Sequence, residues 1–410
     1  MEIAEKIMRA EDLAIATGTP LFSEPLHVGR PNLGSEEALL SRIREVIGRR
    51  WFTNYGPMVQ EFEDRLKQIL GVRHCIPICN GTVALEIAIR AAELKGEVIV
   101  PSFTFVATAH ALQWQEITPV FCDIAAGSHN LDPEQAQRLI TPRTSGIIGV
   151  HVWGKACAHD ELTDLARRRG LKLMYDASHA LGCSLGGTPI GNFGLCEVFS
   201  FHATKFLNSF EGGAIATNDD ELARKIRLMK NFGFSGVDQV TFVGTNGKMN
   251  EISAAMGITG LESMSRFVET NRRNYQLYRS EMEQIKGVKM VLFDERERHN
   301  YQYIVFEIQD EVTGISRDEL VRILTAENVL ARRYFFPGCH RMEPYRSYFP
   351  HAGLLLPHTE ELCNRVLVLP TGTAIGQNEI HAICGIIRTA LAYPNKCKTL
   401  LNNLRTSQLG

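Results

Sequence analysis

The chain has 410 residues, of which 44% are hydrophobic and 22% charged, a composition typical of globular proteins with a sizeable core. Its formal net charge is −2, and its longest basic run has three residues, Arg167 to Arg169. Binding to nucleic acid or to a membrane surface through bulk charge is therefore not expected.

The pattern of apolar residues divides the chain into four parts. Residues 1–25 form a weakly patterned extension, and residues 26–265 alternate strand-like and helical runs. This alternation predicts an α/β domain whose mostly parallel sheet is covered by helices on both faces. A long helix begins near the end of this domain, and residues 266–393 predict a smaller α+β domain. Residues 394–410 are polar, and we predict a loose tail.

Secondary-structure boundaries follow from the same patterns. In the larger domain, the predicted strands are 97–100, 118–123, 145–151, 171–175, 197–201 and 214–217. The predicted helices there include 35–49, 58–70, 83–94, 132–140 and 158–169.

Several signals for location and for metal binding are missing from the sequence. The N-terminal residues lack a basic region followed by an apolar stretch, so no signal peptide is predicted. No apolar run approaches the roughly 20 residues of a membrane-spanning helix, and we expect a cytoplasmic protein. The ten cysteines lack the spacing of a zinc site, and no metal is expected.

Lys205 is the most informative residue because of the segments around it. An apolar run ends at Ser200, Lys205 follows five residues later, and Glu211-Gly-Gly213 opens the next apolar run. Another strand-like run ends on Asp176. A lysine that bonds to an aldehyde and an aspartate that keeps a pyridine nitrogen protonated are the groups that a pyridoxal phosphate enzyme needs.

A phosphate site is predicted at the start of a helix. Asn80-Gly81-Thr82 precedes a helical run, so its backbone amides and the Thr82 hydroxyl suit a phosphate group. Each motif alone also has a plain structural interpretation, because most lysines are solvated and Gly-Thr pairs commonly start helices. Four segments together supply phosphate donors, a partner for a ring nitrogen, a stacking aromatic and an amine, and this combination favours a cofactor site. Asp176, Ser200 and the segment Ser102 to Phe105 follow strands, and ligands gather at the carboxyl ends of strands.

Residues 26–391 resemble the DegT/DnrJ/EryC1/StrS family of sugar aminotransferases, which has the fold type I of pyridoxal phosphate-dependent transferases. The motifs that carry the resemblance are Trp51-Phe-Thr-Asn-Tyr-Gly-Pro57, Asn80-Gly-Thr-Val-Ala-Leu85, Pro101-Ser-Phe-Thr-Phe-Val-Ala-Thr108, Asp176-Ala-Ser-His-Ala-Leu-Gly182, Ser200-Phe-His-Ala-Thr-Lys205, Glu211-Gly-Gly213 and Asn246-Gly-Lys-Met-Asn-Glu251.

This resemblance implies pyridoxal 5′-phosphate as the cofactor and a role for each matching residue. Lys205 bonds to the cofactor and then carries the proton, and Asp176 pairs with the ring nitrogen. His179 lies near the phenolic oxygen, and Phe105 stacks on the ring. The phosphate is held by Gly81, Thr82 and Ser200. Asn246 reaches the phosphate from the neighbouring subunit, which implies a homodimer with shared active sites.

The C-terminal part of the chain narrows the expected substrate. The segment 331–345 resembles that of 4-aminotransferases for dTDP-4-keto-6-deoxyglucose, which serve amino-deoxysugar pathways of natural-product biosynthesis. On that resemblance, Tyr334 and His340 contact the nucleotide sugar, together with Asn54 and Tyr55 from the early turn. The alternative for these side chains is local packing.

The predicted activity is amino transfer from an amino acid, glutamate in most relatives, to a keto sugar in two half-reactions. A 3-keto sugar or a keto-cyclitol is the alternative substrate within the family, and a lysine-dependent dehydration or epimerisation is an alternative reaction. A pyridoxal-binding regulatory protein without turnover is a further alternative. It is disfavoured because the terminal segments are short and not basic enough for a DNA-binding module.

Overall fold

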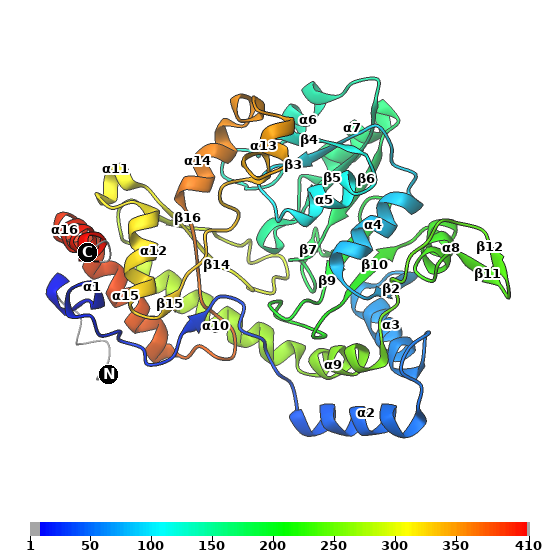
Figure 1. Cartoon of the computed structure of the whole chain (residues 1–410), viewed down its shortest axis with the longest axis horizontal. Coiled ribbons are helices and arrows are strands. Elements are labelled where there is room, and N and C mark those ends of the chain that lie inside the picture. The colour runs from blue at the N-terminus through cyan, green and yellow to red at the C-terminus, as the bar shows by residue number, and fades with distance from the viewer. Residues whose placement is uncertain (1–8, 408–410) are drawn as a thin grey trace.

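A seven-stranded sheet forms the centre of the larger domain in the computed structural model, which describes residues 9–407 (Figure 1). The strand order is β2-β10-β9-β6-β5-β3-β4. In that order the strands are His74–Ile78, Gly213–Thr217, Glu197–Ser200, Lys172–Asp176, Thr144–Val150, Glu97–Pro101 and Thr118–Cys122. β10 is antiparallel to both neighbours and the other neighbouring pairs are parallel, which confirms the predicted mostly parallel sheet.

Helices cover both faces of this sheet because successive side chains of its strands point to opposite faces and are apolar on both. In β5, Ile147 packs on one face and Ile148 on the other. The face of Ile148 is covered by α4 (Gly81–Ala91), α5 (Ala107–Gln113) and α8 (Asp220–Met229). The opposite face is covered by α3 (Pro57–Leu70), α6 (Pro133–Leu139), α7 (His159–Arg169) and α9 (Glu251–Glu262).

The smaller domain is built on the antiparallel strands β13 (Val288–Met290), β14 (Ile304–Ile308) and β16 (Val366–Leu369). The long helix α10 (Met264–Met282) leads into it, and α12 (Arg317–Ala326) and α15 (Gln377–Ala392) pack on its sheet. The further elements are β1 (Leu26–His27), α2 (Glu36–Arg49), β7 (Ser184–Leu185), β8 (Thr188–Pro189), β11 (Phe234–Gly236), β12 (Gln239–Val240), α11 (Asp310–Thr313), β15 (Val329–Leu330), α13 (Tyr345–Tyr348) and α14 (Pro357–Arg365).

Both ends of the described chain are docked on the smaller domain, at the left of Figure 1. The predicted loose tail is wrong, because α16 (Pro394–Ser407) is a helix that buries Cys397 and Leu401. In the predicted extension, α1 (Ala14–Thr17) contacts α16, and the carboxylate of Glu327 accepts a hydrogen bond from the Ala14 backbone. A few apolar side chains at helical spacing dock these polar segments. Residues 1–8 and 408–410 of the predicted extension and tail lie outside the described residues.

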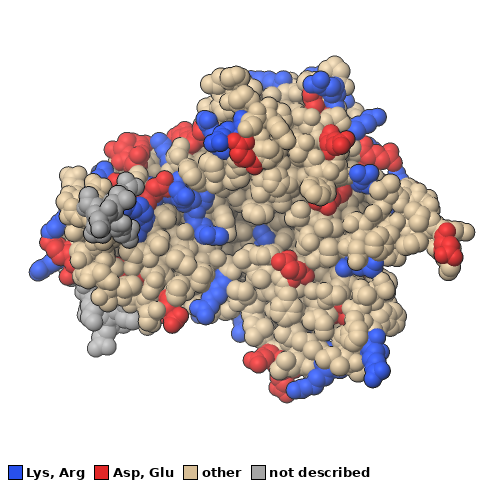
Figure 2. Space-filling view, viewed as in Figure 1, with Lys and Arg blue, Asp and Glu red and all other residues tan. Residues whose placement is uncertain are grey.

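The described residues show the distribution of surface charge, the lengths of the helices and the arrangement of possible metal ligands. Figure 2 shows Lys and Arg interspersed with Asp and Glu over the face in view. Within residues 9–407, no helix is both long enough and apolar enough to cross a bilayer. The same residues contain no group of three or more His, Cys, Asp or Glu side chains arranged to hold a metal ion.

Candidate active site

The predicted site residues lie where parallel strands end. β6 ends at Asp176, β9 ends at Ser200, and β3 leads into the loop that carries Phe105. Because the carboxyl ends of parallel strands share one edge of a sheet, three segments far apart in sequence converge there. The structure therefore brings Lys205, on the segment after β9, near enough to Asp176 for the two charges to interact.

The carboxylate of Asp176 is held rigidly by two donors. The Thr108 hydroxyl donates to Oδ2 over 2.8 Å, and the backbone N–H of Ser178 donates to Oδ1 over 3.0 Å. A carboxylate has about four acceptor positions, so this buried group keeps capacity for another donor. Thr108, on the first turn of α5, was not predicted as a site residue. Its hydroxyl after the β3 loop is a signal that the sequence does contain.

Lys205 has an amine of unusually low basicity. Burial lowers the pKa of Lys205 to about 8, and the negative charge of Asp176 opposes this shift. Within residues 9–407, the amine has no hydrogen-bond acceptor. A substantial fraction of Lys205 is thus neutral at slightly alkaline pH, the form that attacks an aldehyde.

His179 presents one free ring nitrogen in an aromatic setting. Its ring lies nearly parallel to those of Trp153 and Phe335, at 6.1 and 5.8 Å between centroids. The Trp153 backbone N–H donates to Nδ1 over 3.3 Å, so the neutral ring carries its proton on Nε2. Burial, and then the positive charge of Lys205, hold the pKa of His179 well below its usual value. His179 is therefore a neutral donor.

The start of α4 forms a small cradle beside β9 and β10. The Asn80 side chain accepts from the Val83 N–H over 2.9 Å, which leaves the first amides of the helix available. A Cβ added to Gly213 would lie 2.8 Å from the Asn80 carbonyl carbon, and one added to Gly81 would lie 3.1 Å from the Ser200 Cβ. Side chains at either glycine would fill this cradle, so its shape requires both glycines.

Two further predicted cofactor residues are exposed. Phe105 is 59% exposed on the loop after β3. Asn246 is exposed next to the edge strand β2, where the neighbouring carbonyl of Gly247 accepts from the Cys79 N–H over 2.8 Å. Their contacts with a cofactor stay predictions.

The structure separates the predicted sugar contacts into two groups. Tyr334 is partly buried, with its ring 6.2 Å from Tyr303, whose ring lies 4.7 Å from His179. His340 is only 2% exposed, and both ring nitrogens are engaged, by Ser102 Oγ and Glu360 Oε1, each at 2.7 Å. This arrangement does not support the predicted sugar contact of His340. It ties the segment after β3 to α14 instead.

Asn54 and Tyr55 line a basic cavity of about 220 Å³ next to α8. Its cations are Arg227, Lys230 and Lys248. Arg227 pairs with the buried carboxylate of Glu63, whereas neither lysine has an ion-paired carboxylate among residues 9–407. Burial lowers the pKa of Lys230 to about 8, and its amine lies 5.2 Å from the centroid of the Tyr55 ring. The cavity therefore suits an anionic group.

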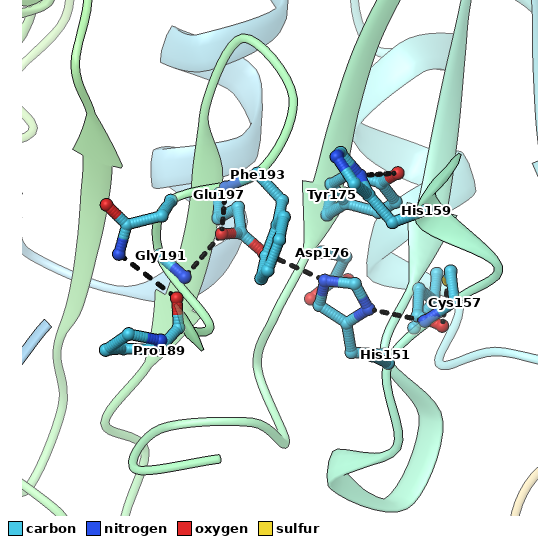
Figure 3. A network of polar contacts seen from close by, with 12 residues as sticks. His151, Cys157, His159, Tyr175, Asp176, Pro189, Gly191, Phe193 and Glu197 are labelled. Atoms are coloured by element: carbon cyan, nitrogen blue, oxygen red, sulfur yellow. Dashed lines mark hydrogen bonds and ion pairs between the residues drawn. The ribbon is translucent and has the colours of Figure 1, made fainter. Parts of the chain in front are cut away.

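A second polar cluster, centred on Glu197, lies on the opposite face of the sheet from α5 (Figure 3). Glu197 accepts from His151 Nε2 over 2.8 Å and from the backbone N–H groups of Gly191 and Phe193. The other nitrogen of His151 accepts from the Cys157 N–H over 3.0 Å. These polar groups are all satisfied within the protein, and we assign this Glu197 cluster to the support of strands β5, β6 and β9.

Comparisons with known proteins agree with this geometry. A model described as the DegT/DnrJ/EryC1/StrS aminotransferase family matches residues 34–388. The dTDP-4-amino-4,6-dideoxy-D-glucose transaminase of Shigella dysenteriae is 35% identical over 367 residues, which cover 90% of this chain and 99% of that protein. The protein of the same name from Escherichia coli is 33% identical over 363 residues, covering 88% and 97%.

Solved structures also match this chain, one with a TDP-sugar product and one of an aminotransferase. The crystal structure of DesI in the presence of its TDP-sugar product matches with a TM-score of 0.91 and 46% identity, covering 95% of this chain and 98% of that chain. Helicobacter pylori PseC, an aminotransferase involved in the biosynthesis of pseudoaminic acid, matches with a TM-score of 0.83 and 25% identity, covering 90% and 100%. This chain belongs to the DegT/DnrJ/EryC1/StrS aminotransferase family.

Proposed function

We propose that the protein is a pyridoxal phosphate-dependent aminotransferase that moves an amino group from glutamate to a nucleotide-linked keto sugar. The observation that carries this proposal is Lys205, whose pKa of about 8 and contact with Asp176 suit an amine that bonds reversibly to an aldehyde. Membership of an aminotransferase family supports the reaction class.

The residues present fit pyridoxal phosphate at four places. The cradle at Gly81, Thr82 and Ser200 combines open helix N-terminal amides with a hydroxyl, as a phosphate requires. Asp176 has acceptor capacity for a protonated ring nitrogen. His179 has an Nε2–H for the phenolic oxygen. Phe105 is free to cover a ring.

When bound, the cofactor supplies an aldehyde that bonds to amines and a ring that accepts electron density from the adjacent carbon. Asp176 keeps a proton on the ring nitrogen, because its charge favours the protonated form. Lys205 would hold the cofactor at rest. As a free amine, Lys205 would take a proton from one carbon and return it at another. The same residues act in reverse when the keto sugar receives nitrogen.

The proposed acceptor is dTDP-4-keto-6-deoxyglucose, aminated at C4. Two relatives, one of them 35% identical, carry the name dTDP-4-amino-4,6-dideoxy-D-glucose transaminase, which supports this sugar. The basic cavity lined by Asn54 and Tyr55 has a charge suited to the diphosphate of such a nucleotide. Tyr334 is proposed to face the sugar from the smaller domain.

Mass spectrometry of the product formed from dTDP-4-keto-6-deoxyglucose and glutamate tests this proposal. The expected change in the sugar is replacement of its carbonyl oxygen by NH2 and H, with formation of 2-oxoglutarate from glutamate. Nitrogen-15 glutamate should place the label on the sugar. Release of ammonia without 2-oxoglutarate would contradict amino transfer, and reaction only with a 3-keto sugar would contradict the proposed acceptor.

The active unit is proposed to be a homodimer with shared sites. The hairpin β11–β12 projects from the body at the right of Figure 1 and, with its flanks, exposes apolar side chains. They are Phe232, Phe234, Val237, Val240 and Val243. A second copy of the chain is the proposed occupant of this surface, because Asn246 lies just beyond the hairpin.

Mixing two inactive variants tests the shared site. In a mixed dimer of Lys205→Ala and Asn246→Ala, one site carries both defects and the other carries neither. Part of the wild-type activity should return after subunit exchange, which native mass spectrometry verifies independently. If Asn246→Ala is severely impaired alone and exchange occurs, no recovery would show that Asn246 serves its own subunit.

A further inference from the structure

The segment Asn300–Tyr303, just before β14, touches both catalytic loops from the smaller domain. Tyr301 has a φ of 49° although it is neither glycine nor exposed. A buried residue in this conformation persists only where the surrounding structure holds it. The side chains of Asn300 and Gln302, on either side of Tyr301, form hydrogen bonds with the two loops.

One side chain of the segment, Gln302, forms a hydrogen bond with the backbone of Phe206, the residue directly after Lys205. The Gln302 carbonyl oxygen Oε1 accepts from the Phe206 N–H over 3.0 Å. On the other side of the same residue, the Phe206 carbonyl accepts from Asn32 Nδ2 over 2.9 Å. Asn32 and Gln302 are 4% and 8% exposed. Two buried side-chain amides that are far apart in the sequence thus bond to both polar backbone groups of Phe206.

The Asn32 side chain and the Gln302 backbone are themselves held, whereas Gln302 Nε2 has no hydrogen-bond partner among residues 9–407. Asn32 Oδ1 accepts from the backbone and the hydroxyl of Thr373, at 3.0 and 2.8 Å. The Gln302 N–H donates to Asn300 Oδ1 over 3.0 Å, and Asn300 Nδ2 donates to the carbonyls of His179 and Leu181. The smaller domain therefore sets the position of the Lys205 segment relative to the loop that carries His179.

We propose that Gln302 and Asn32 are positioning residues that hold the Phe206 backbone so that the Lys205 amine meets the aldehyde of the cofactor. This inference rests on the proposed role of Lys205. It does not make either amide a catalytic residue, because each acts only through Phe206. The hydrogen bonds themselves, rather than the packing of the two side chains, are the feature that matters.

Two isosteric substitutions separate hydrogen bonding from packing and charge. Asn32→Asp keeps the acceptor for Thr373 but loses the N–H that donates to Phe206. Gln302→Glu keeps an oxygen acceptor for the Phe206 N–H. Both bury one carboxylate beside the same residue, so a role in packing or in charge burial alone would affect them equally.

The primary measurement is the rate at which added pyridoxal phosphate becomes fixed on Lys205 by borohydride, followed by peptide mass spectrometry of the full-length apo protein. We expect Asn32→Asp and Gln302→Met to slow this rate roughly tenfold, as for the loss of one buried hydrogen bond. Gln302→Glu should restore most of it. Gln115→Met is the matched control, because within residues 9–407 the Gln115 side chain makes its hydrogen bonds with Glu86, Arg90 and Ala111.

Hydrogen exchange of the Phe206 amide gives a second readout without cofactor. Exchange should quicken in Gln302→Met and stay protected in Gln302→Glu and Gln115→Met. Fixation at the rate of Gln115→Met in both Asn32→Asp and Gln302→Met would overturn the inference. If Asn32→Asp does not fold, the Gln302→Met result decides by the same criterion. Fixation of the wild type on another lysine would instead contradict the proposed function.

Discussion

Two buried polar clusters lie near the same strands and differ in how far their hydrogen bonds are satisfied. In the Glu197 cluster, the Glu197 carboxylate has three donors and His151 is engaged at both nitrogens. Around Lys205, the amine has no hydrogen-bond acceptor within residues 9–407, and Asp176 keeps acceptor positions. Asp176, His151 and Glu197 are buried and Lys205 is partly buried, so unsatisfied polar groups in both clusters are unfavourable.

This difference separates structural support from chemistry. A polar group with every hydrogen bond satisfied inside the protein stabilises strands and has no capacity left for a ligand. Unsatisfied capacity beside a titratable partner, as at Lys205 and Asp176, marks a candidate ligand site. Neither burial nor unused hydrogen-bonding capacity identifies the active site alone, because Asn271, Asn274 and His299 also keep buried atoms without a partner among residues 9–407.

The largest expected effect is on catalysis, at Asp176. Asp176→Asn keeps the shape of the side chain but removes the charge that holds a proton on the ring nitrogen. We expect pyridoxal phosphate still to bind. The activation free energy of turnover should rise by about 3–5 kcal/mol. Steady-state rates and absorbance titration measure the two effects. Turnover near that of the wild type would reduce Asp176 to a cap of the following turn.

At the Glu197 cluster, the expected effect is on stability. Glu197→Gln leaves one oxygen to accept hydrogen bonds and weakens those made by a charged acceptor, so the free energy of unfolding should fall by about 2–3 kcal/mol. Turnover per folded molecule should stay within about threefold, because the cluster has no capacity for a ligand. Urea unfolding and active-site titration measure these quantities. A loss of turnover as large as in Asp176→Asn would remove the distinction between the clusters.

A smaller effect is expected at the basic cavity. Lys230→Met removes a cation without an ion-paired carboxylate, so KM for the nucleotide sugar should rise about tenfold, or ~1.4 kcal/mol. The half-reaction with glutamate should be unchanged. Lys225→Met is the control on the same helix, because Lys225 is paired with Glu93. Equal damage to both half-reactions would place Lys230 in the support of the fold.

The smallest effect is a shift in pH dependence. Because the neutral amine attacks, fixation of pyridoxal phosphate by Lys205 should rise about tenfold per pH unit below the pKa of about 8 and level off above it. The charge of Asp176 raises the pKa of Lys205, so Asp176→Asn should move the bend to lower pH. Stopped-flow absorbance over pH 6–10 measures both profiles. A bend near the ordinary lysine value would mean that Lys205 is solvated.

The sequence predicted the fold class well, because strands and helices depend on local patterns, and the site residues stay predictions. Strand-like runs ending at Asp176 and Ser200 place those residues at one edge of a parallel sheet. The strand β2, which the pattern did not predict, is interrupted by Pro77 and lies at the edge of the sheet, where a proline is tolerated.

Long-range hydrogen bonding could not be predicted. Asn32 and Gln302 are ordinary polar residues in sequence, and their common partner Phe206 lies more than 90 residues from each. His340 fits a substrate contact by motif, yet Ser102 and Glu360 occupy its ring nitrogens. Such partners depend on how the two domains pack, and no spacing along the chain records that packing.

Borohydride reduction followed by peptide mapping tests the central claim most directly. The full-length protein is loaded with pyridoxal phosphate, reduced and digested, and the mass of the adduct is located by fragmentation. The account predicts a single reduced adduct on Lys205, on the segment after β9. An adduct on another lysine, or no adduct despite bound cofactor, would contradict the assignment of Lys205 and the function built on it.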